Sequence, residues 1–381
     1  MKVGCPPPLW RHPHAAALAL SSFSGLMKQL LADAPRTLAW HTYDDRPLQP
    51  DELRLRVAYA SPKHGSEIAD FRGNSPLIDE KYDPDWQLLV PRTGDDPAGV
   101  VFGEWNVGNM VVGHVEECAP AVTEFAVGDR VVAYSGIRET AIVRAVGNHR
   151  LRKLPADMPW QSALCYDPAQ FALGGIRDGQ VRPGDAVVVM GLGAIGQLAV
   201  QMARHIGAYP IVAVDPVANR RAVAQRSGAH AALDPTAGDT GRQIKELTGQ
   251  RGADVIIETS GSAPALQAAF RGLAYGGIVS YVAWPKEFPA GLHLGREAHY
   301  NNARMVFSRV ASEPLPDYPR WTRRRIEDTV WYLLTQGFLD GREIIQPVVP
   351  TAEAIGAYHH YVDQHPDQSI KLGIDLTGGW T

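Results

Sequence analysis

The stretch DAVVVMGLGAIGQLAVQMARHIG, residues 185–207, determines the fold of this chain. Residues 185–191 form an apolar run of the kind found in buried strands, and 197–207 carry apolar residues at helical spacing. The turn between them, 191–196, has the pattern GxGxxG. A GxGxxG turn that follows a strand and opens a helix is the context expected of a dinucleotide-binding fold.

Each glycine of this turn has a separate role in the motif. The first permits the tight turn, the second lets the backbone approach a pyrophosphate, and the third allows the helix and the strand to pack closely. The start of the helix offers unpaired N–H groups and the positive end of its dipole to the phosphates. The cofactor-binding residues expected here are Gly191, Gly193, Ala194, Ile195 and Gly196.

A second strand, PIVAVD at 210–215, ends at Asp215, nineteen residues after the last glycine of the turn. A carboxylate at this place accepts hydrogen bonds from ribose hydroxyls and repels a 2′-phosphate, which favours NAD over NADP. Arg220 and Arg221 follow a turn later and offer positive charge for a phosphate, so we count Arg220 with the cofactor residues. The alternative role of Asp215 is to cap the helix at 218–228.

Strands and helices continue to alternate after this motif. The segments are a strand at 254–261, a helix at 263–272 and a strand at 276–284. This alternation predicts a parallel sheet with helices on both faces. By contrast, 53–132 is β-like and punctuated by Gly and Pro, which indicates a small irregular β domain. After residue 312, two helical segments lead to a last strand at 370–376, which we expect to rejoin the first domain.

The chain therefore divides into four parts. We expect a loose N-terminal extension over 1–26, a mostly-β catalytic domain over 27–165, an α/β dinucleotide-binding domain over 166–312 and a C-terminal return to the catalytic domain over 313–381. The extension has one early lysine and a short apolar stretch, and a secretory signal peptide has a more basic start and a longer one.

Composition restricts the class of protein. A length of 381 residues suits two domains, and 45% apolar with 20% charged residues is ordinary for a folded protein in water. The net charge of −4 argues against a nucleic-acid partner, and no apolar run is long enough for a membrane helix. Cys5, Cys118 and Cys165 lie far apart with no CxxC, which predicts no disulfide framework and a reducing, cytoplasmic location.

Three stretches carry a family resemblance: VAYASPKHGSEIADFRG at 57–73, GHVEECAPAVTEFAVGDRVV at 113–132, and 167–208. They resemble the first zinc-ligand segment, the GxVxxxGxxVxxFxxGDRV stretch and the domain junction of the medium-chain dehydrogenase/reductase superfamily, the zinc-type alcohol and polyol dehydrogenases. The resemblance implies a Rossmann domain inserted in a GroES-like catalytic domain, with the active site in the cleft between them. It also implies a homodimer or homotetramer.

The chain departs from the family at the catalytic metal. The first ligand, a Cys in the family, falls on His64, and the family's Gly-His-Glu motif falls on Gly108-Asn109-Met110. The third ligand falls on Asp167, while Cys165 is two residues off register and is expected to pack as a small apolar side chain. The structural-zinc cysteines are absent as well. Catalytic zinc takes three good ligands, and only two of these residues qualify, so the sequence favours chemistry without a metal.

An alcohol oxidation without zinc needs a base for the hydroxyl proton and a donor for the developing alkoxide. His64 titrates in a suitable range, and Asp167, if buried beside it, would orient and charge-stabilise it. Ser66 occupies the position where the family carries a Ser or Thr of its proton relay, and Lys63 is a further donor to the substrate oxygen. For a lone histidine or lysine, a structural or solvated role is the alternative.

Substrate recognition is expected in the loop GEWNVGN at 103–109. Trp105 would stack on a sugar face, Glu104 would accept hydroxyl hydrogens, and Asn109 lies beside them; an ordinary capped loop is the alternative. Weaker candidates are Arg138, Glu139 and His299, and the stretch HHYVDQH at 359–365 is interpreted as a solvated helix face.

Three functions follow from these residues. The first is an NAD-dependent dehydrogenase of a polyol, cyclitol or sugar-like secondary alcohol, with His64 and Asp167 in place of zinc. The second is a zinc-dependent dehydrogenase with an atypical site of His64, Asn109 and Asp167. The third is a non-catalytic NAD-binding relative. All three take a small-molecule ligand rather than a nucleic acid or a membrane.

Overall fold

The computed structural model describes residues 26–284, 288 and 291–379. The extension expected over 1–26 lies outside the described residues except for Leu26, and Cys5 lies there too. Among the helices in the described part of the chain, none combines the length and the apolar character needed to cross a lipid bilayer.

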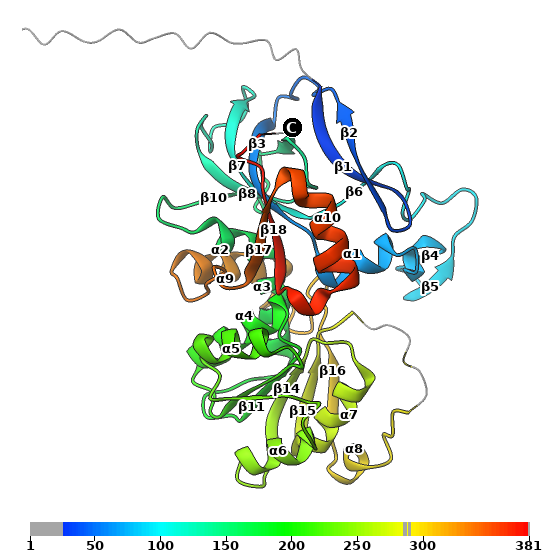
Figure 1. Cartoon of the computed structure of the whole chain (residues 1–381), viewed down its shortest axis with the longest axis vertical. Helices are drawn as coiled ribbons and strands as arrows, with labels where there is room; N and C mark the ends of the chain where they lie inside the picture. The colour runs from blue at the N-terminus through cyan, green and yellow to red at the C-terminus, as the bar shows by residue number, and fades with distance from the viewer. Residues whose placement is uncertain (1–25, 285–287, 289–290, 380–381) are drawn as a thin grey trace, which may run out of the picture.

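Six strands form one parallel sheet in the spatial order β13-β12-β11-β14-β15-β16. Their bounds are Val187–Met190 for β11, Ile211–Val214 for β12, Ala231–Leu233 for β13, Ala253–Glu258 for β14, Leu273–Tyr281 for β15 and Arg304–Phe307 for β16. The helices packed around this sheet are α4 (Ala194–Ile206), α5 (Ala218–Ser227), α6 (Thr240–Leu247), α7 (Ala263–Gly272) and the short α8 (Glu297–Tyr300) (Figure 1).

This sheet confirms the predicted Rossmann architecture. All four residues of β11 are buried, as expected for a central strand that helices cover on both faces. The strand order reverses between β11 and β14, and ligands of such sheets bind at the carboxyl ends of the strands where the order reverses. The glycine-rich turn follows β11 directly, so it lies at that point.

A second sheet is mostly antiparallel and has the order β10-β8-β7-β3-β18-β17, with β9 also paired to β3. Its strands are β3 (Glu52–Ser61), β7 (Met110–Cys118), β8 (Arg130–Ala133), β9 (Thr140–Arg144), β10 (Arg152–Lys153), β17 (Ile345–Pro350) and β18 (Lys371–Asp375). The smaller sheets combine β1 (Met27–Ala34), β2 (Thr37–Tyr43) and β6 (Trp105–Asn106), and β4 (Glu80–Asp83) with β5 (Leu88–Pro91).

The end of the chain returns to this second sheet. After α9 (Arg323–Thr335) and α10 (Ala354–Tyr358), strand β18 pairs antiparallel with β3, where Ile374 lies opposite Ala60. Figure 1 shows the red C-terminal strand among the blue and green strands of the first half of the chain. The return places β18 against α1 (His64–Phe71), the helix that carries the first family ligand position.

The two sheets share one apolar core. Helices α2 (Trp160–Leu164) and α3 (Tyr166–Asp178) lie between them, and a single buried cluster includes Met110 of the mixed sheet and Leu198 of α4. The candidate site residues on α1 and α3 are therefore held by packing from both parts of the molecule.

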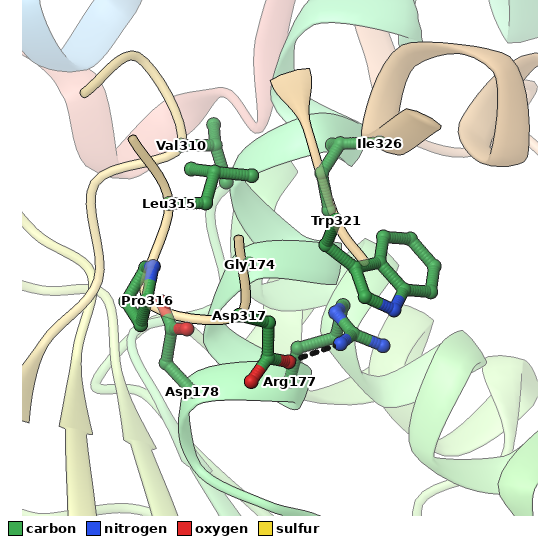
Figure 2. A pocket seen from close by; sticks show the side chains of 9 residues that line it. All are labelled: Gly174, Arg177, Asp178, Val310, Leu315, Pro316, Asp317, Trp321 and Ile326. Carbon is green, nitrogen blue, oxygen red and sulfur yellow. Dashed lines mark hydrogen bonds and ion pairs between the residues drawn. The ribbon is translucent and has the colours of Figure 1, made fainter. Parts of the chain in front are cut away.

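The carboxyl end of α3 closes against the segment before α9 (Figure 2). The Trp321 ring lies 3.5 Å from the Arg177 guanidinium carbon and 4.2 Å from that of Arg325, and Arg177 also pairs with Asp317. The cavity left there has a volume of only about 10 Å³, room for one water at most. This contact is a structural joint rather than a substrate site.

Candidate active site

The glycine-rich turn has the geometry that a dinucleotide requires. Gly191 has φ of 84°, and a Cβ at Gly196 would lie 1.9 Å from the Gly191 carbonyl oxygen, so neither position accepts a side chain. Gly193 has no atom within 4 Å of the Cβ position, which leaves its face open. Ala194 and Ile195 begin α4, and no side chain caps that helix at Gly193. The backbone N–H groups at the start of α4 therefore fit a pyrophosphate.

Asp215 braces the turn from the end of β12. It is 3% exposed, its Oδ2 accepts the Leu192 N–H at 2.7 Å, and its Oδ1 accepts the Val217 N–H at 2.8 Å. The second bond closes a turn just before α5, and since the N-cap residue of α5 is Val217 with no side-chain cap, Asp215 does not cap that helix. Because a carboxylate offers about four acceptor sites, this bonding leaves capacity for a ribose hydroxyl.

The arginines after Asp215 are occupied within the protein. Arg220 donates to the Ser369 carbonyl and to the Pro366 carbonyl, and its Nη1 lies 3.7 Å from Asp215 Oδ2. Arg221 donates to the Asp215 and Pro216 carbonyls and pairs with Asp234 at 3.1 Å. Neither guanidinium projects freely toward the place of a 2′-phosphate.

A charged cluster forms where α1 meets α3. Lys63 Nζ lies 3.4 Å from Asp167 Oδ2 and 4.7 Å from the centre of the Phe171 ring. The Tyr134 hydroxyl donates to Asp167 Oδ1 at 3.3 Å and accepts a hydrogen bond from Gln170 Nε2 at 2.9 Å. Asp167 is 6% exposed, so its carboxylate relies on these two partners.

His64 is adjacent to this cluster but has a different partner. Its Nε2 accepts the Leu372 N–H at 2.9 Å, so a neutral ring carries its proton on Nδ1. Burial, together with the positive charges of Lys371 and Arg220, lowers the pKa of His64 well below its ordinary value. The described residues show no hydrogen bond between His64 and Asp167, and the orientation expected from Asp167 comes instead from the backbone of β18.

Two buried charged residues of the site escaped the sequence analysis. Lys371 is 4% exposed and donates to the Pro62 carbonyl, directly before the Lys63–His64 pair. Burial lowers the pKa of Lys371, and the nearby Asp167 carboxylate opposes that shift. The available signal was a lysine inside the otherwise apolar strand IKLGIDL.

Glu67 is the second residue. Its Oε1 accepts the Tyr358 hydroxyl at 2.9 Å, and its Oε2 accepts the N–H groups of Gly108 at 2.8 Å and Lys63 at 3.5 Å. Burial raises the pKa of this carboxyl. One side chain thus joins α1, α10 and the loop that carries Asn109. Its acidic character was visible in the sequence, but its three partners were not.

The predicted substrate residues separate into two groups. Asn109 lies at the site, and its buried Oδ1 has no hydrogen-bond partner in the described structure. Trp105 belongs to β6 beside Ala32 and packs against an apolar cluster, and Glu104 is exposed. Within the described residues, no contact joins Trp105, Glu104 or the partly exposed Ser66 to the Lys63–Asp167 pair.

The weaker candidates lie elsewhere. Arg138 packs on the Tyr43 ring, Glu139 pairs with Arg56, and His299 is exposed on α8. In the histidine-rich stretch, His360 bonds to Gln368 at 2.9 Å.

The residues at the family's metal positions do not fit zinc. His64 Nε2 already accepts an N–H, Asn109 is a neutral amide, and Asp167 pairs with an ammonium. In the described part of the chain, no group of three His, Cys, Asp or Glu residues is placed to hold a metal ion. Cys165 is buried among apolar residues, and burial raises the pKa of its thiol to about 12. Zinc requires a better donor set than this.

Comparison with known proteins decides the family. Residues 194–323 match the family model described as zinc-binding dehydrogenase. The chain is 55% identical over 348 residues to D-guloside 3-dehydrogenase of Escherichia coli K12, covering 91% of this chain and 99% of the relative. The chain belongs to the medium-chain dehydrogenase/reductase superfamily. It is a dehydrogenase that acts on CH–OH groups, and members of this superfamily use NAD or NADP.

Solved structures of medium-chain dehydrogenases share the fold. The alcohol dehydrogenase TADH from Thermus sp. ATN1 superposes with a TM-score of 0.67 at 22% identity, covering 92% of this chain and 99% of that one. The 2R,3R-butanediol dehydrogenase from Bacillus subtilis gives 0.70 at 20% identity, with the same coverage of both chains.

Proposed function

We propose that this medium-chain dehydrogenase interconverts a secondary alcohol of a sugar-like substrate and its ketone, with NAD and without zinc. In this proposal 166–312 binds the cofactor, and 27–165 with 313–381 forms the catalytic part. The observation that carries it is the Lys63–Asp167 ion pair at 3.4 Å, in which a partly exposed lysine meets a buried carboxylate at the family's third metal position. The relative from Escherichia coli, which acts on a D-guloside, supports the substrate class.

The oxidation transfers a hydride and a proton. When bound, NAD accepts the hydride of the carbinol carbon. Asp167 accepts the hydroxyl proton, and the Lys63 ammonium stabilises the negative charge that grows on the oxygen. His64, held neutral, donates through Nδ1 to the same oxygen. Ser66 enters the proposal only as the family's proton-relay position, because no contact in the described structure joins its hydroxyl to Asp167. In the reverse direction Asp167 returns the proton.

A polyhydroxylated substrate suits the unpaired groups of the site. The buried Asn109 Oδ1 lacks a hydrogen-bond donor, and leaving it unpaired costs about 1–3 kcal/mol. A second hydroxyl of the substrate would satisfy it. Glu104 and Trp105 remain in the proposal as residues that approach the substrate only from the outer side of that loop.

The choice of NAD rests on Asp215. In this proposal its carboxylate would bind the adenosine ribose hydroxyls, and it is supported by Arg220 and Arg221, whose guanidinium groups donate to backbone carbonyl groups. We expect kcat/KM with NAD to exceed that with NADP by about 10²-fold or more, because a 2′-phosphate would lie against a buried carboxylate.

The decisive experiment is an assay of the purified protein with NAD and a panel of D-gulosides, polyols and simple alcohols. We expect guloside turnover that survives dialysis against a chelator. Lys63→Met and Asp167→Asn should each lower kcat by about 10²–10³-fold, the loss typical of a removed acid–base group or charge-stabilising donor. Lys81→Met is the matched control, because Lys81 is also ion-paired, to Asp96, but lies on β4 away from the site.

Each alternative predicts its own result. Stoichiometric zinc with chelator inhibition would replace this proposal with the atypical zinc site of His64, Asn109 and Asp167. NAD binding without turnover on the whole panel would favour a non-catalytic relative. A homo-oligomer in the cytoplasm completes the proposal, and sedimentation velocity tests the assembly.

A further inference from the structure

Arg220 is unusual because its side chain links α5 of the cofactor-binding part to the segment that precedes β18. It lies in the first turn of α5 in the cofactor-binding part, and its side chain is 16% exposed. Nε and Nη2 donate to the Ser369 carbonyl at 2.9 and 2.6 Å, and Nη2 also donates to the Pro366 carbonyl. Both acceptors belong to the segment 366–369, which leads into β18 of the catalytic sheet.

The backbone of Arg220 is tied to the glycine-rich turn. Gln197 of α4 donates through Nε2 to the carbonyl of Arg220 at 2.8 Å and to that of Leu192 at 3.2 Å. The Leu192 N–H in turn donates to Asp215 Oδ2, and the same oxygen lies 3.7 Å from Arg220 Nη1. The arginine is therefore fixed relative to the place where the pyrophosphate and ribose would lie.

The segment that Arg220 holds continues directly into the catalytic cluster. Two residues after Ser369, Lys371 donates to the Pro62 carbonyl, and the next N–H, that of Leu372, donates to His64 Nε2. Lys63, between Pro62 and His64, pairs with Asp167. A continuous set of hydrogen bonds thus runs from the cofactor turn to the proposed reacting groups.

We propose that Arg220 is a positioning residue. Its hydrogen bonds to the segment 366–369, which we call the latch, join the two parts of the molecule and fix the positions of His64 and Lys63 relative to the bound cofactor. The inference rests on the proposed function, since it assigns the latch to that reaction. The planar guanidinium holds its N–H donors in a rigid fork that can engage two carbonyl groups at once, whereas the three donors of a lysine sit on one compact ammonium at the end of a flexible stem. The latch replaces the phosphate contact that the sequence suggested for this residue.

The test compares Arg220→Gln with Arg226→Gln. Arg226 also lies on α5, but its partner Glu343 is half exposed, so its loss costs little. We expect Arg220→Gln to lower kcat by about tenfold or more, because displaced catalytic groups lose reactivity steeply with distance. Affinity for ADP-ribose, which lacks the nicotinamide, should stay within about threefold of wild type. Arg226→Gln should match wild type in both.

Two further readouts separate a latch from general destabilisation. The deuterium isotope effect on kcat should rise in Arg220→Gln, because hydride transfer becomes slower relative to product release. Amide hydrogen exchange over 366–372 should accelerate in the free protein, with the exchange of α4 unchanged. Arg220→Lys, which keeps the charge, should fall between wild type and Arg220→Gln.

Other results would contradict the role of Arg220 or the proposed function. A large loss of ADP-ribose affinity with kcat retained would make Arg220 a direct cofactor ligand and overturn the latch. If wild type neither binds NAD nor turns over any alcohol, the proposed function fails. The exchange measurement then decides the latch alone, and unchanged exchange over 366–372 in Arg220→Gln would refute it.

Discussion

The cofactor turn and the catalytic cluster are built in opposite ways. The turn uses backbone: three glycines within six residues and a helix start, braced by one carboxylate from the next strand. The cluster uses side chains from four distant segments, with Lys63 and His64 on one, Tyr134 and Asp167 on two others, and Lys371 on the last strand. The turn therefore depends on the absence of side chains, and the cluster depends on long-range packing.

The largest effect is expected from Gly196→Ala, a substitution that disrupts the glycine-rich turn. In Gly196→Ala the new Cβ would lie 1.9 Å from the Gly191 carbonyl oxygen, and backbone cannot yield as a flexible side chain does. We expect a loss of about 3 kcal/mol in the free energy of unfolding, at the upper end for overpacking, together with loss of measurable NAD binding. Urea denaturation and NADH titration measure the two quantities.

Gly193→Ala is the matched control for that change. Nothing lies within 4 Å of its Cβ position, so the free energy of unfolding should change by less than about 1 kcal/mol. NAD affinity should still fall by about tenfold or more, because the methyl group occupies the face that the pyrophosphate approaches. Equal destabilisation in the two variants would contradict the backbone account of the turn.

The same difference explains what the sequence could predict. Gly191, Gly193, Gly196 and Asp215 occur in a local pattern whose spacing encodes its geometry, so the Rossmann sheet and its turn were predicted correctly. The partners of Asp167 were not predicted. Tyr134 directly follows strand β8, 33 residues earlier, and only the packing of α3 against the mixed sheet brings the two together.

His64 shows why alignment with the family's sequence pattern was insufficient to predict the contacts of the site. The family pattern placed it at the site, but its hydrogen-bond partner is the Leu372 N–H, 308 residues further along the chain. No local pattern encodes that contact, because it requires β18 to pair with β3 across the whole cofactor-binding part of the sequence. The same insertion buries Lys371, which sequence inspection treats as one more surface lysine.

Tyr134→Phe tests the contribution of one hydrogen bond to the charged cluster. Its expected effect is smaller than that of the glycine substitutions. The change removes the hydroxyl that donates to Asp167 Oδ1 and leaves the ring in place. A hydrogen bond to a charged group contributes about 1.5–3 kcal/mol, so we expect kcat to fall by about tenfold or somewhat more, with KM for NAD unchanged.

Tyr166→Phe is the control for that substitution. Tyr166 is also buried near α3, but its hydroxyl contacts Arg152 rather than Asp167. An equal loss of kcat in both variants would show that the packing of α3, and not the bond to Asp167, governs the rate.

The smallest expected effect concerns Glu67, which joins the cluster to its surroundings. Burial raises the pKa of Glu67 above its ordinary 4.5, so the folded state binds this proton more tightly than the unfolded chain does. The resulting stabilisation is complete below pH 4.5 and is lost as the pH rises through the folded-state pKa. Burial of Glu67 thus opposes its charged form, and its three hydrogen bonds support that form.

Glu67→Gln removes this titration while keeping the shape of the side chain. Its amide oxygen can accept the Gly108 N–H, and its amide nitrogen can donate to the Tyr358 oxygen, so the variant should fold. Relative to wild type, the free energy of unfolding of the variant should improve as the pH rises above 4.5, measured by urea denaturation across that range. Glu104→Gln, at an exposed position, should show no such trend. A pH-independent difference would mean that Glu67 acts only through the geometry of its hydrogen bonds to the Gly108 and Lys63 N–H groups and the Tyr358 hydroxyl, and not through its charge.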